Sequence, residues 1–287
     1  MKLVVVDKSR TAYENLAINH ACFDAVNCGD FESIVRVYPF SRPGAILSFN
    51  EDLWDVRGGV FGKIDVTRRP TGGSVIYVDG DTLGYSVFLK TNSKVDVTRL
   101  YREFTGRVVR ALNSFGLDVS VSNWYVRLNG GVIAGHAQVN RGSASEFQGI
   151  VRLKKWDMDA LERALRLRTL GKYDGAHYLI VDDAVYDLKG NKRSISVNKV
   201  RRLRDERSEL ASAPGLDGFG VRAPDLAERL AGCLSGSDER HELPGSIMSR
   251  AKSWLSHYMN PDLVLKPGVT TKSCLGHCFV DLVESEQ

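Results

Sequence analysis

Two adjacent arginines followed by a pair of glycines form the stretch of this chain best suited to chemistry: Arg68-Arg69-Pro-Thr-Gly72-Gly73-Ser-Val-Ile-Tyr-Val-Asp79. Glycine lets the backbone turn tightly and lets its N–H groups approach a ligand closely. Arginine side chains beside such N–H groups make a natural site for a phosphate or a carboxylate. The stretch therefore predicts an anion-binding loop, and the alternative is a β-turn with solvated arginines.

Short runs rich in β-branched residues lie on both sides of this loop, separated by Gly, Pro, Asn and Asp. They predict strands at residues 2–6, 34–38, 45–49, 64–68, 75–78, 83–89, 119–121, 124–128, 132–139 and 147–153. Apolar residues at three- and four-residue steps predict helices at residues 10–26, from the N-cap Asp96 to Gly116, and from the N-cap Asp157 through Leu170. The connections between strands are too short to carry a helix each, so we expect an α+β fold with a mostly antiparallel sheet packed against helices.

The last third of the chain has a different character. Residues 198–207 are densely charged, residues 211–224 are rich in Ala, Gly, Ser and Pro, and residues 225–234 and 247–258 have helical patterns. We interpret the charged run as a solvated helix face, because acidic residues interrupt it and no aromatic residues for base stacking are interleaved. The sequence thus predicts a main domain at 1–210 and a small, partly helical C-terminal region at 211–287, with no nucleic-acid partner.

The composition of the chain is that of an ordinary globular protein. Of its 287 residues, 43% are hydrophobic and 26% are charged, and the net charge of +4 would suit an acidic protein partner. No apolar run approaches the roughly 20 residues of a membrane helix, and the N-terminus lacks the pattern of a signal peptide. Five cysteines at loose spacing indicate reduced thiols rather than a disulfide framework. We therefore expect a cytoplasmic protein without a membrane partner.

Several motifs resemble those of the lipoate–protein ligases. The segment from Arg68 to Asp79, followed by Asp81-x-Leu83-x-Tyr85-Ser86, is similar to the family pattern Arg-Arg-x-Ser-Gly-Gly-Gly-Ala-Val-Tyr-His-Asp…Tyr-Ser. Other family motifs occur in the same order: Glu14-Asn15-x-Ala17, Arg36-x-Tyr38 with Pro43, and Asn129-Gly130 followed by Ile133-Ala-Gly135-x-Ala137-Gln138. Biotin–protein ligases and octanoyltransferases are more distant relatives with the same catalytic-domain fold.

The resemblance implies a two-step reaction, in which lipoate reacts with ATP (with Mg²⁺) to give lipoyl-adenylate and the acyl group then passes to a carrier lysine. The carrier would be a lipoyl domain of a 2-oxoacid dehydrogenase or the carrier protein of the glycine cleavage system, and a separate accessory chain could complete the enzyme. By the same resemblance, the ligand-binding residues would be Arg68, Arg69, Gly72, Gly73, Ser74, Val75, Tyr77, Asp79, Ile133, Gly135, His136 and Ala137. For His136, a hydrogen bond within the sheet is an equally good expectation.

The chain also departs from the family pattern. Val132 replaces the catalytic lysine of the Lys-Ile-x-Gly motif, Ser74 replaces the third glycine of the loop, and Ser48 and Phe49 replace a Gly and an Arg. Removing one charge-stabilising donor typically costs about 10²–10³ in rate. A substitute cation could come from Lys63, Arg127 or Arg141, whereas the cysteine nucleophile of octanoyltransferases has no counterpart.

Three hypotheses follow for function. The chain is an acyltransferase with a rearranged cation, a non-catalytic family member that binds an acyl-adenylate or a carrier protein, or an unrelated ligand or nucleic-acid binder.

A C-terminal group of three possible metal ligands, Cys274, His277 and Cys278, has a spacing that matches no standard zinc knuckle. We therefore predict no metal site in the protein and leave the role of these three residues open.

Overall fold

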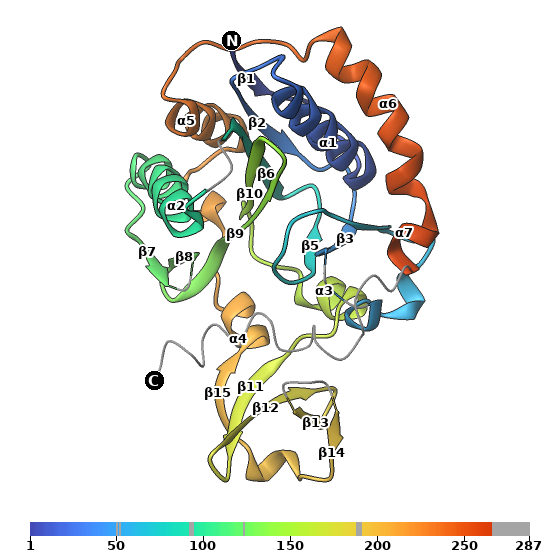
Figure 1. Cartoon of the computed structure of the whole chain (residues 1–287). Coiled ribbons are helices and arrows are strands. Elements are labelled where there is room, and N and C mark those ends of the chain that lie inside the picture. The colour runs from blue at the N-terminus through green and yellow to red at the C-terminus, as the bar shows by residue number, and fades with distance from the viewer. Residues whose placement is uncertain (50, 52, 92–94, 123, 188–190, 266–287) are drawn as a thin grey trace.

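A seven-stranded sheet forms the centre of the molecule in this computed structural model, which describes all residues except 50, 52, 92–94, 123, 188–190 and 266–287 (Figure 1). Its strand order is β1-β2-β6-β10-β9-β8-β7. The strands are β1 (Lys2–Val6), β2 (Ser33–Pro39), β6 (Thr82–Lys90), β7 (Val119–Ser122), β8 (Tyr125–Leu128), β9 (Gly131–Arg141) and β10 (Ala144–Arg152). The pair β1–β2 is parallel and the other pairs are antiparallel. The predicted α+β class is therefore confirmed.

Helices cover both faces of this sheet. On one face, α1 (Ala12–Cys28) packs against α6 (Gly245–Met259), and on the other α2 (Val97–Asn113) packs against α5 (Ala223–Ser235) (Figure 1). Helix α1 begins with a capping box between Thr11 and Glu14, and it ends at Gly29 with a left-handed φ of 89°. Helix α2 begins at the predicted N-cap Asp96, whose side chain accepts a hydrogen bond from the Arg99 amide.

The C-terminal helices contribute directly to the core around the sheet. Leu226 and Leu230 of α5 belong to the same buried cluster as Phe147 of β10 and Leu112 of α2. On the opposite face, Ile247 of α6 is buried with residues of α1. The proposed division of the chain into residues 1–210 and 211–287 stays a prediction.

A small sheet with the order β4-β3-β5 carries the arginine–glycine loop. Its strands are β3 (Gly44–Leu47), β4 (Asp65–Arg68) and β5 (Ile76–Val78), so residues 69–75 connect β4 to β5. Short 3-10 helices at Leu53–Asp55 and Gly58–Val60 precede β4. Helix α3 (Met158–Ala164) packs on the second of these, and α7 (Pro261–Leu265) packs on β4. The loop therefore joins β4 and β5, which both pair with β3.

A third sheet forms a lobe at the lower end of the view in Figure 1, and we call residues 169–205 the lobe. Its strand order is β14-β13-β12-β11-β15. The strands are β11 (Thr169–Tyr173), β12 (Ala176–Val181), β13 (Ala184–Asp187), β14 (Lys192–Arg193) and β15 (Arg201–Asp205), and α4 (Glu206–Ala211) follows. The chain enters the lobe after Arg168 and leaves it into α4, and Arg57 pairs with Asp182 of the lobe.

Two predictions about this region were wrong. The helix that begins at Asp157 ends at Ala164 rather than continuing through Leu170, because Leu165 forms a bridge with Val56 and Thr169 pairs with Asp205. Residues 201–205 form strand β15 rather than a helix face, because they pair with β11. In both places a backbone partner distant in sequence decides the structure, which local propensity cannot anticipate.

Two other features bear on the sequence-based expectations. Among the described residues, no helix combines the length and apolar character needed to cross a membrane. Cys22, Cys28 and Cys233 are free thiols, whereas Cys274, His277 and Cys278 lie outside the described residues.

A buried arginine ties the first strands to helix α1. Arg36 of β2 is fully buried, and its guanidinium lies 2.7 Å from the carboxylate of Asp7. The same guanidinium donates hydrogen bonds of 2.7 Å to the side-chain oxygens of Asn15 and Asn19. Because Asn15 also borders the cavity described below, this network fixes one wall of the site.

We predict that Arg36→Ala lowers the free energy of unfolding by about 3–5 kcal/mol, because it leaves two buried asparagine oxygens without their donor and Asp7 with Arg10 as its remaining arginine partner. The matched control is Arg250→Ala, which breaks a more exposed 2.7 Å pair with Asp30 and should cost less than about 1 kcal/mol. Urea unfolding followed by fluorescence measures both values. Equal losses in the two variants would contradict the structural role of Arg36.

Candidate functional site

A cavity of about 190 Å³ lies where the arginine–glycine loop, strands β9 and β10, helix α1 and the segment 165–168 meet. Helix α4 closes another side of it. Apolar side chains dominate its lining: Leu16, Phe40, Ile46, Val75, Ile76, Val132, Ile133, Ile150, Leu161, Leu165, Leu167 and Leu210. Such a cavity is suited to the apolar part of a small ligand, with the few polar groups at its border setting the orientation.

The cavity brings together most of the site residues expected from the sequence. Those that border it are Arg69, Gly73, Ser74, Val75, Tyr77, Ile133, Gly135, His136 and Ala137. Val132, which stands in place of the family lysine, borders the same cavity. The loop and the β9 motif, which are about 60 residues apart in sequence, therefore face one space.

Arg68, Gly72 and Asp79 are not among the residues that line the cavity. The Arg68 guanidinium donates hydrogen bonds to the carbonyl oxygens of Ser48 and Glu51, each at 2.6 Å, and so fastens β4 to the segment before the first 3-10 helix. Asp79 is paired with Arg152 and accepts a hydrogen bond from the Asp81 amide in the turn after β5. These contacts support the frame of the site, and direct ligand contacts by the three residues stay predictions.

Arg69 holds the shape of the glycine loop. Its side chain is buried, and Nη2 donates hydrogen bonds to the carbonyl oxygens of Gly72 and Ser74 at 2.8 and 2.7 Å. Nη1 donates to the carbonyl oxygen of Ile46 in β3 at 3.0 Å, and Nε donates to Thr71 Oγ1 at 2.9 Å. These four hydrogen bonds hold the loop in shape and attach it to β3.

Gly73 is required by the conformation of this loop. Its φ is 95°, in the left-handed region that favours glycine. A Cβ atom at this position would lie 3.1 Å from Arg69 Nη2, so a side chain would also press on the arginine that holds the loop. At Gly72, by contrast, an added Cβ would have no atom within 4 Å, and φ is not in the left-handed region.

Strand β9 borders the cavity with Gly135 and Ala137, and His136 borders it too although its ring packs on Phe147. Gly135 packs against the Tyr125 ring, which would lie 3.3 Å from an added Cβ. The His136 ring instead stacks on Phe147, with centroids 5.1 Å apart, and its Nδ1 lies 2.7 Å from the carbonyl oxygen of Trp124. Phe147 in turn contacts Tyr101 of α2, so the imidazole belongs to the α2 side of the sheet. Burial lowers the pKa of His136 to about 4, and the ring is neutral with Nδ1 as the donor.

Charged residues at the cavity border were missed by the sequence analysis. Arg166 and Arg168 line it from the segment before β11, and Glu206 and Glu209 line it from α4. The alternation Leu165-Arg166-Leu167-Arg168 has the period of a strand and could have revealed these residues, but the interpretation of the segment as a helix hid it.

Arg168 belongs to a buried ionic cluster beside the cavity. Its guanidinium contacts the carboxylates of Asp55 and, at 3.3 Å, Glu51, and all three side chains are buried. Burial and the neighbouring Asp55 raise the pKa of Glu51 to about 8, so this carboxyl is protonated at neutral pH. With Glu51 protonated, the Arg168 guanidinium balances the Asp55 carboxylate, so the cluster places no net negative charge beside the cavity.

None of the described residues that line the cavity is a lysine. Lys63, Arg127 and Arg141, the substitute cations considered from the sequence, do not line it either. Arg127 instead pairs with Glu209 at 3.2 Å. Among the described residues there is also no cluster of three or more His, Cys, Asp or Glu side chains that could hold a metal ion.

A buried carboxyl lies on β10 beside the site. Glu146 is two residues from Gln148, which borders the cavity, and its side chain is buried. Burial raises the pKa of Glu146 to about 8, although a hydrogen bond from Ser86 and the charge of Arg69 act in the opposite direction. The carboxyl is therefore protonated in the folded protein at neutral pH.

Comparison with known proteins agrees with the motifs. Residues 11–203 match the family described as the lipoyl protein ligase A/B catalytic domain. No curated protein matches the chain by sequence.

Solved structures share the fold at low sequence identity. A lipoate-protein ligase A bound with ATP is 17% identical, with a TM-score of 0.69 over 92% of this chain and 99% of its own. A T. acidophilum protein with bound lipoic acid is 17% identical, with a TM-score of 0.68 over 93% and 100%. A bi-partite lipoate protein ligase of Thermoplasma acidophilum, studied with its E2 lipoyl domain, is also 17% identical, with a TM-score of 0.66 over 96% and 97%.

We predict that Gly73→Ala destabilises the loop and weakens binding of a non-hydrolysable lipoyl-adenylate. The left-handed backbone costs a non-glycine residue roughly 1–2 kcal/mol, and the added Cβ displaces Arg69. Gly72→Ala is the matched control, since its Cβ meets open space and should change affinity little. Urea unfolding and calorimetric titration measure the two effects. Similar affinities in both variants would mean that the loop is only a turn.

We predict that Glu146→Gln changes how stability depends on pH. The Glu146 carboxyl has a pKa of about 8 in the folded protein, against an ordinary value of 4.5. As pH rises from about 4.5 to 8, the unfolded chain loses this proton while the folded protein keeps it, so the free energy of unfolding of the wild type falls. The variant removes this loss, so its melting temperature relative to wild type should rise across that window and differ little at pH 4. Glu239→Gln, which removes an exposed carboxylate, gives the baseline. A constant difference at every pH would refute the assignment.

Proposed function

The chain belongs to the family of lipoyl protein ligase A/B catalytic domains, and from this membership we propose that it activates lipoate, or a similar acid, with ATP and transfers the acyl group to a carrier lysine. One observation carries the proposal beyond membership. The arginine–glycine loop and the β9 motif, which hold the ligand in the resemblance, border a single apolar cavity. Tight placement of both reactants in one cavity lowers the entropic part of the reaction barrier.

The apolar lining supports an aliphatic acid as the substrate. Ile133 and Ala137 of β9 and Ile150 of β10 offer a continuous apolar wall for a hydrocarbon chain. Each buried methylene contributes about 0.8 kcal/mol to binding, so a chain of several methylenes would be held firmly without charged contacts. Which acid is preferred, lipoate or octanoate, depends on how far this wall extends.

The polar end of the substrate would lie at the arginine–glycine loop. In the first step a carboxylate oxygen attacks the α-phosphorus of ATP and pyrophosphate leaves, and in the second step the carrier amine attacks the acyl carbon and AMP leaves. The backbone N–H groups at residues 73–75 would face the phosphate, and the arginines at the cavity border would add positive charge nearby. Because the described residues offer no metal cluster, Mg²⁺ would enter with the phosphates of ATP, as it commonly does.

The partner in this proposal is a lipoyl carrier domain, and a related solved protein supports it. That relative is a bi-partite ligase studied with its E2 lipoyl domain, so a separate accessory chain is also part of the proposal. A carrier from a 2-oxoacid dehydrogenase or from the glycine cleavage system would serve equally. Use of ATP and free thiols fits a cytoplasmic location.

A second candidate function is binding of an acyl-adenylate or a carrier without transfer. It is favoured by Val132 and by the lack of a lysine among the described lining residues. In the family the lysine ammonium stabilises negative charge that develops at the carboxyl and phosphate, and valine cannot replace it.

Incubation with ATP, lipoate and an apo lipoyl domain, read by mass spectrometry, separates the two functions. A gain of one lipoyl group on the carrier supports the ligase. Adenylate binding without that gain supports the non-catalytic binder. Failure to bind adenylate, lipoate or carrier contradicts both.

We predict that Val132→Lys raises the rate of lipoyl transfer, by up to about 10²–10³ if wild type lacks a substitute cation. The free variant should be less stable, because an ammonium in an apolar strand is unfavourable, and it should recover stability when adenylate is bound. Melting temperatures with and without ligand accompany the transfer assay. Val121→Lys, at an exposed position of β7, is the control for added charge and should change neither measurement. A variant that neither transfers nor gains stability would show that the cavity is not an adenylate site.

A further inference from the structure

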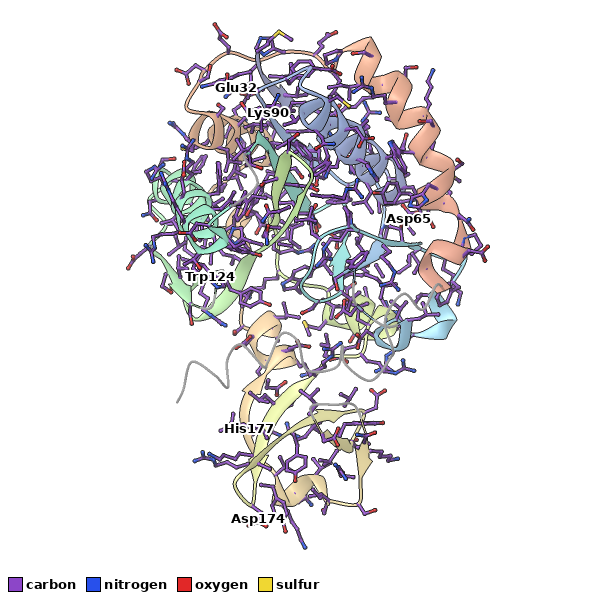
Figure 2. The ribbon with its side chains drawn as sticks, viewed as in Figure 1. Glu32, Asp65, Lys90, Trp124, Asp174 and His177 are labelled. Carbon is purple, nitrogen blue, oxygen red and sulfur yellow. The ribbon has the colours of Figure 1, made fainter. Side chains whose placement is uncertain are left out.

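Three basic side chains lie opposite one another across neighbouring strands of the lobe. Arg201 of β15 pairs with Lys172 of β11, and Lys172 pairs with His177 of β12. Directly opposite residues project from the same face of a sheet with Cβ atoms about 4.5–5.5 Å apart. We call these three residues the basic row. Figure 2 labels His177 on this lobe, with Asp174 towards the end away from the seven-stranded sheet.

The basic row is unfavourable for the protein alone. Like charges placed directly opposite each other destabilise a sheet, and both Lys172 and Arg201 are exposed. Within the described part of the chain, neither of them forms an ion pair. Three acidic residues of the lobe are engaged elsewhere: Asp182 with Arg57 and Arg166, Asp187 with Arg193, and Asp205 with Arg202. A charge arrangement that costs stability and stays open to solvent is typical of a surface that binds an opposite charge.

The basic row is also close to the cavity along the chain. Arg168, which lines the cavity, precedes Lys172 by four residues of extended backbone, a span of about 13 Å. At the other end, β15 runs directly into α4, whose Glu206 and Glu209 line the cavity. A partner held on the row therefore lies next to the site where an acyl group would be transferred.

We propose that the basic row is the docking surface for the carrier domain and recognises carboxylates of an acidic patch on that domain. This inference rests on the proposed function and names the surface that its partner uses. The row spans only two strand spacings, about 10 Å, which fits a local group of carboxylates. Acidic residues on the same lobe, such as Asp174 and Asp183, would repel the continuous phosphate backbone of a nucleic acid.

Lys172→Glu tests the proposal, because it should act in opposite directions on stability and on docking. The new carboxylate faces Arg201, so the melting temperature should stay equal or rise. The KM for an apo lipoyl domain of a 2-oxoacid dehydrogenase should rise at least about tenfold, since like charges at an interface are strongly unfavourable. The rate of adenylate formation and kcat at saturating carrier should not change. Lys252→Glu, an equal charge change on the exposed face of α6, should leave the KM unchanged.

Direct binding separates failure of the inference from failure of the proposed function. If wild type forms no adenylate, the proposed function fails, and titration of the apo lipoyl domain into wild type, Lys172→Glu, Lys172→Gln and Lys252→Glu at two salt concentrations still measures docking. Weaker binding in the two Lys172 variants alone, with a reduced salt dependence, supports the basic row. Equal affinity in all four proteins, or no binding by wild type, overturns it. Loss of oligonucleotide binding in Lys172→Glu with unchanged carrier affinity would also overturn it and assign the row to nucleic acid.

Discussion

The buried guanidinium of Arg69 is the constraint on which the site depends. A charged group removed from water must be matched by hydrogen-bond acceptors, and Arg69 finds them in the carbonyl oxygens of Ile46, Gly72 and Ser74. Satisfying this one side chain bends the loop, requires the left-handed backbone at Gly73, and joins the loop to β3. In this arrangement the arginine holds the loop in shape, and the loop borders the cavity.

The other walls of the cavity follow from the packing of elements distant in sequence. The chain just after helix α4 approaches β9 so closely that a Cβ on Gly131 would lie 2.3 Å from the Ala213 Cα atom. Val132 is therefore placed between the sheet and α4, at the border of an apolar space. A lysine there would be stabilised by the negative charge of an adenylate bound in the same cavity. The apolar side chains that dominate the lining suit the hydrocarbon part of the proposed acid substrate.

The sequence was sufficient where structure depends on local signals. Asp96 and Asp157 are recognisable as N-caps because each is an aspartate at the start of an amphipathic run, and both side chains do bond to amides three residues later. Most strands of the central sheet are likewise recognisable from β-branched runs. The lobe and β15 were missed, because pairing with a distant strand overrides local preference. The roles of Arg68 and Arg69 could not be separated either, since both have the same sequence environment and differ only in which carbonyl groups surround them.

A structure with a non-hydrolysable lipoyl-adenylate tests most directly whether the loop and β9 form one acyl-adenylate site. We expect the acyl chain to lie against Ile133 and Ala137, and the phosphate mimic to lie within hydrogen-bond distance of backbone N–H groups between Gly73 and Val75. An analogue bound outside the cavity, or bound in it without contact to this loop, would contradict the assignment of the site.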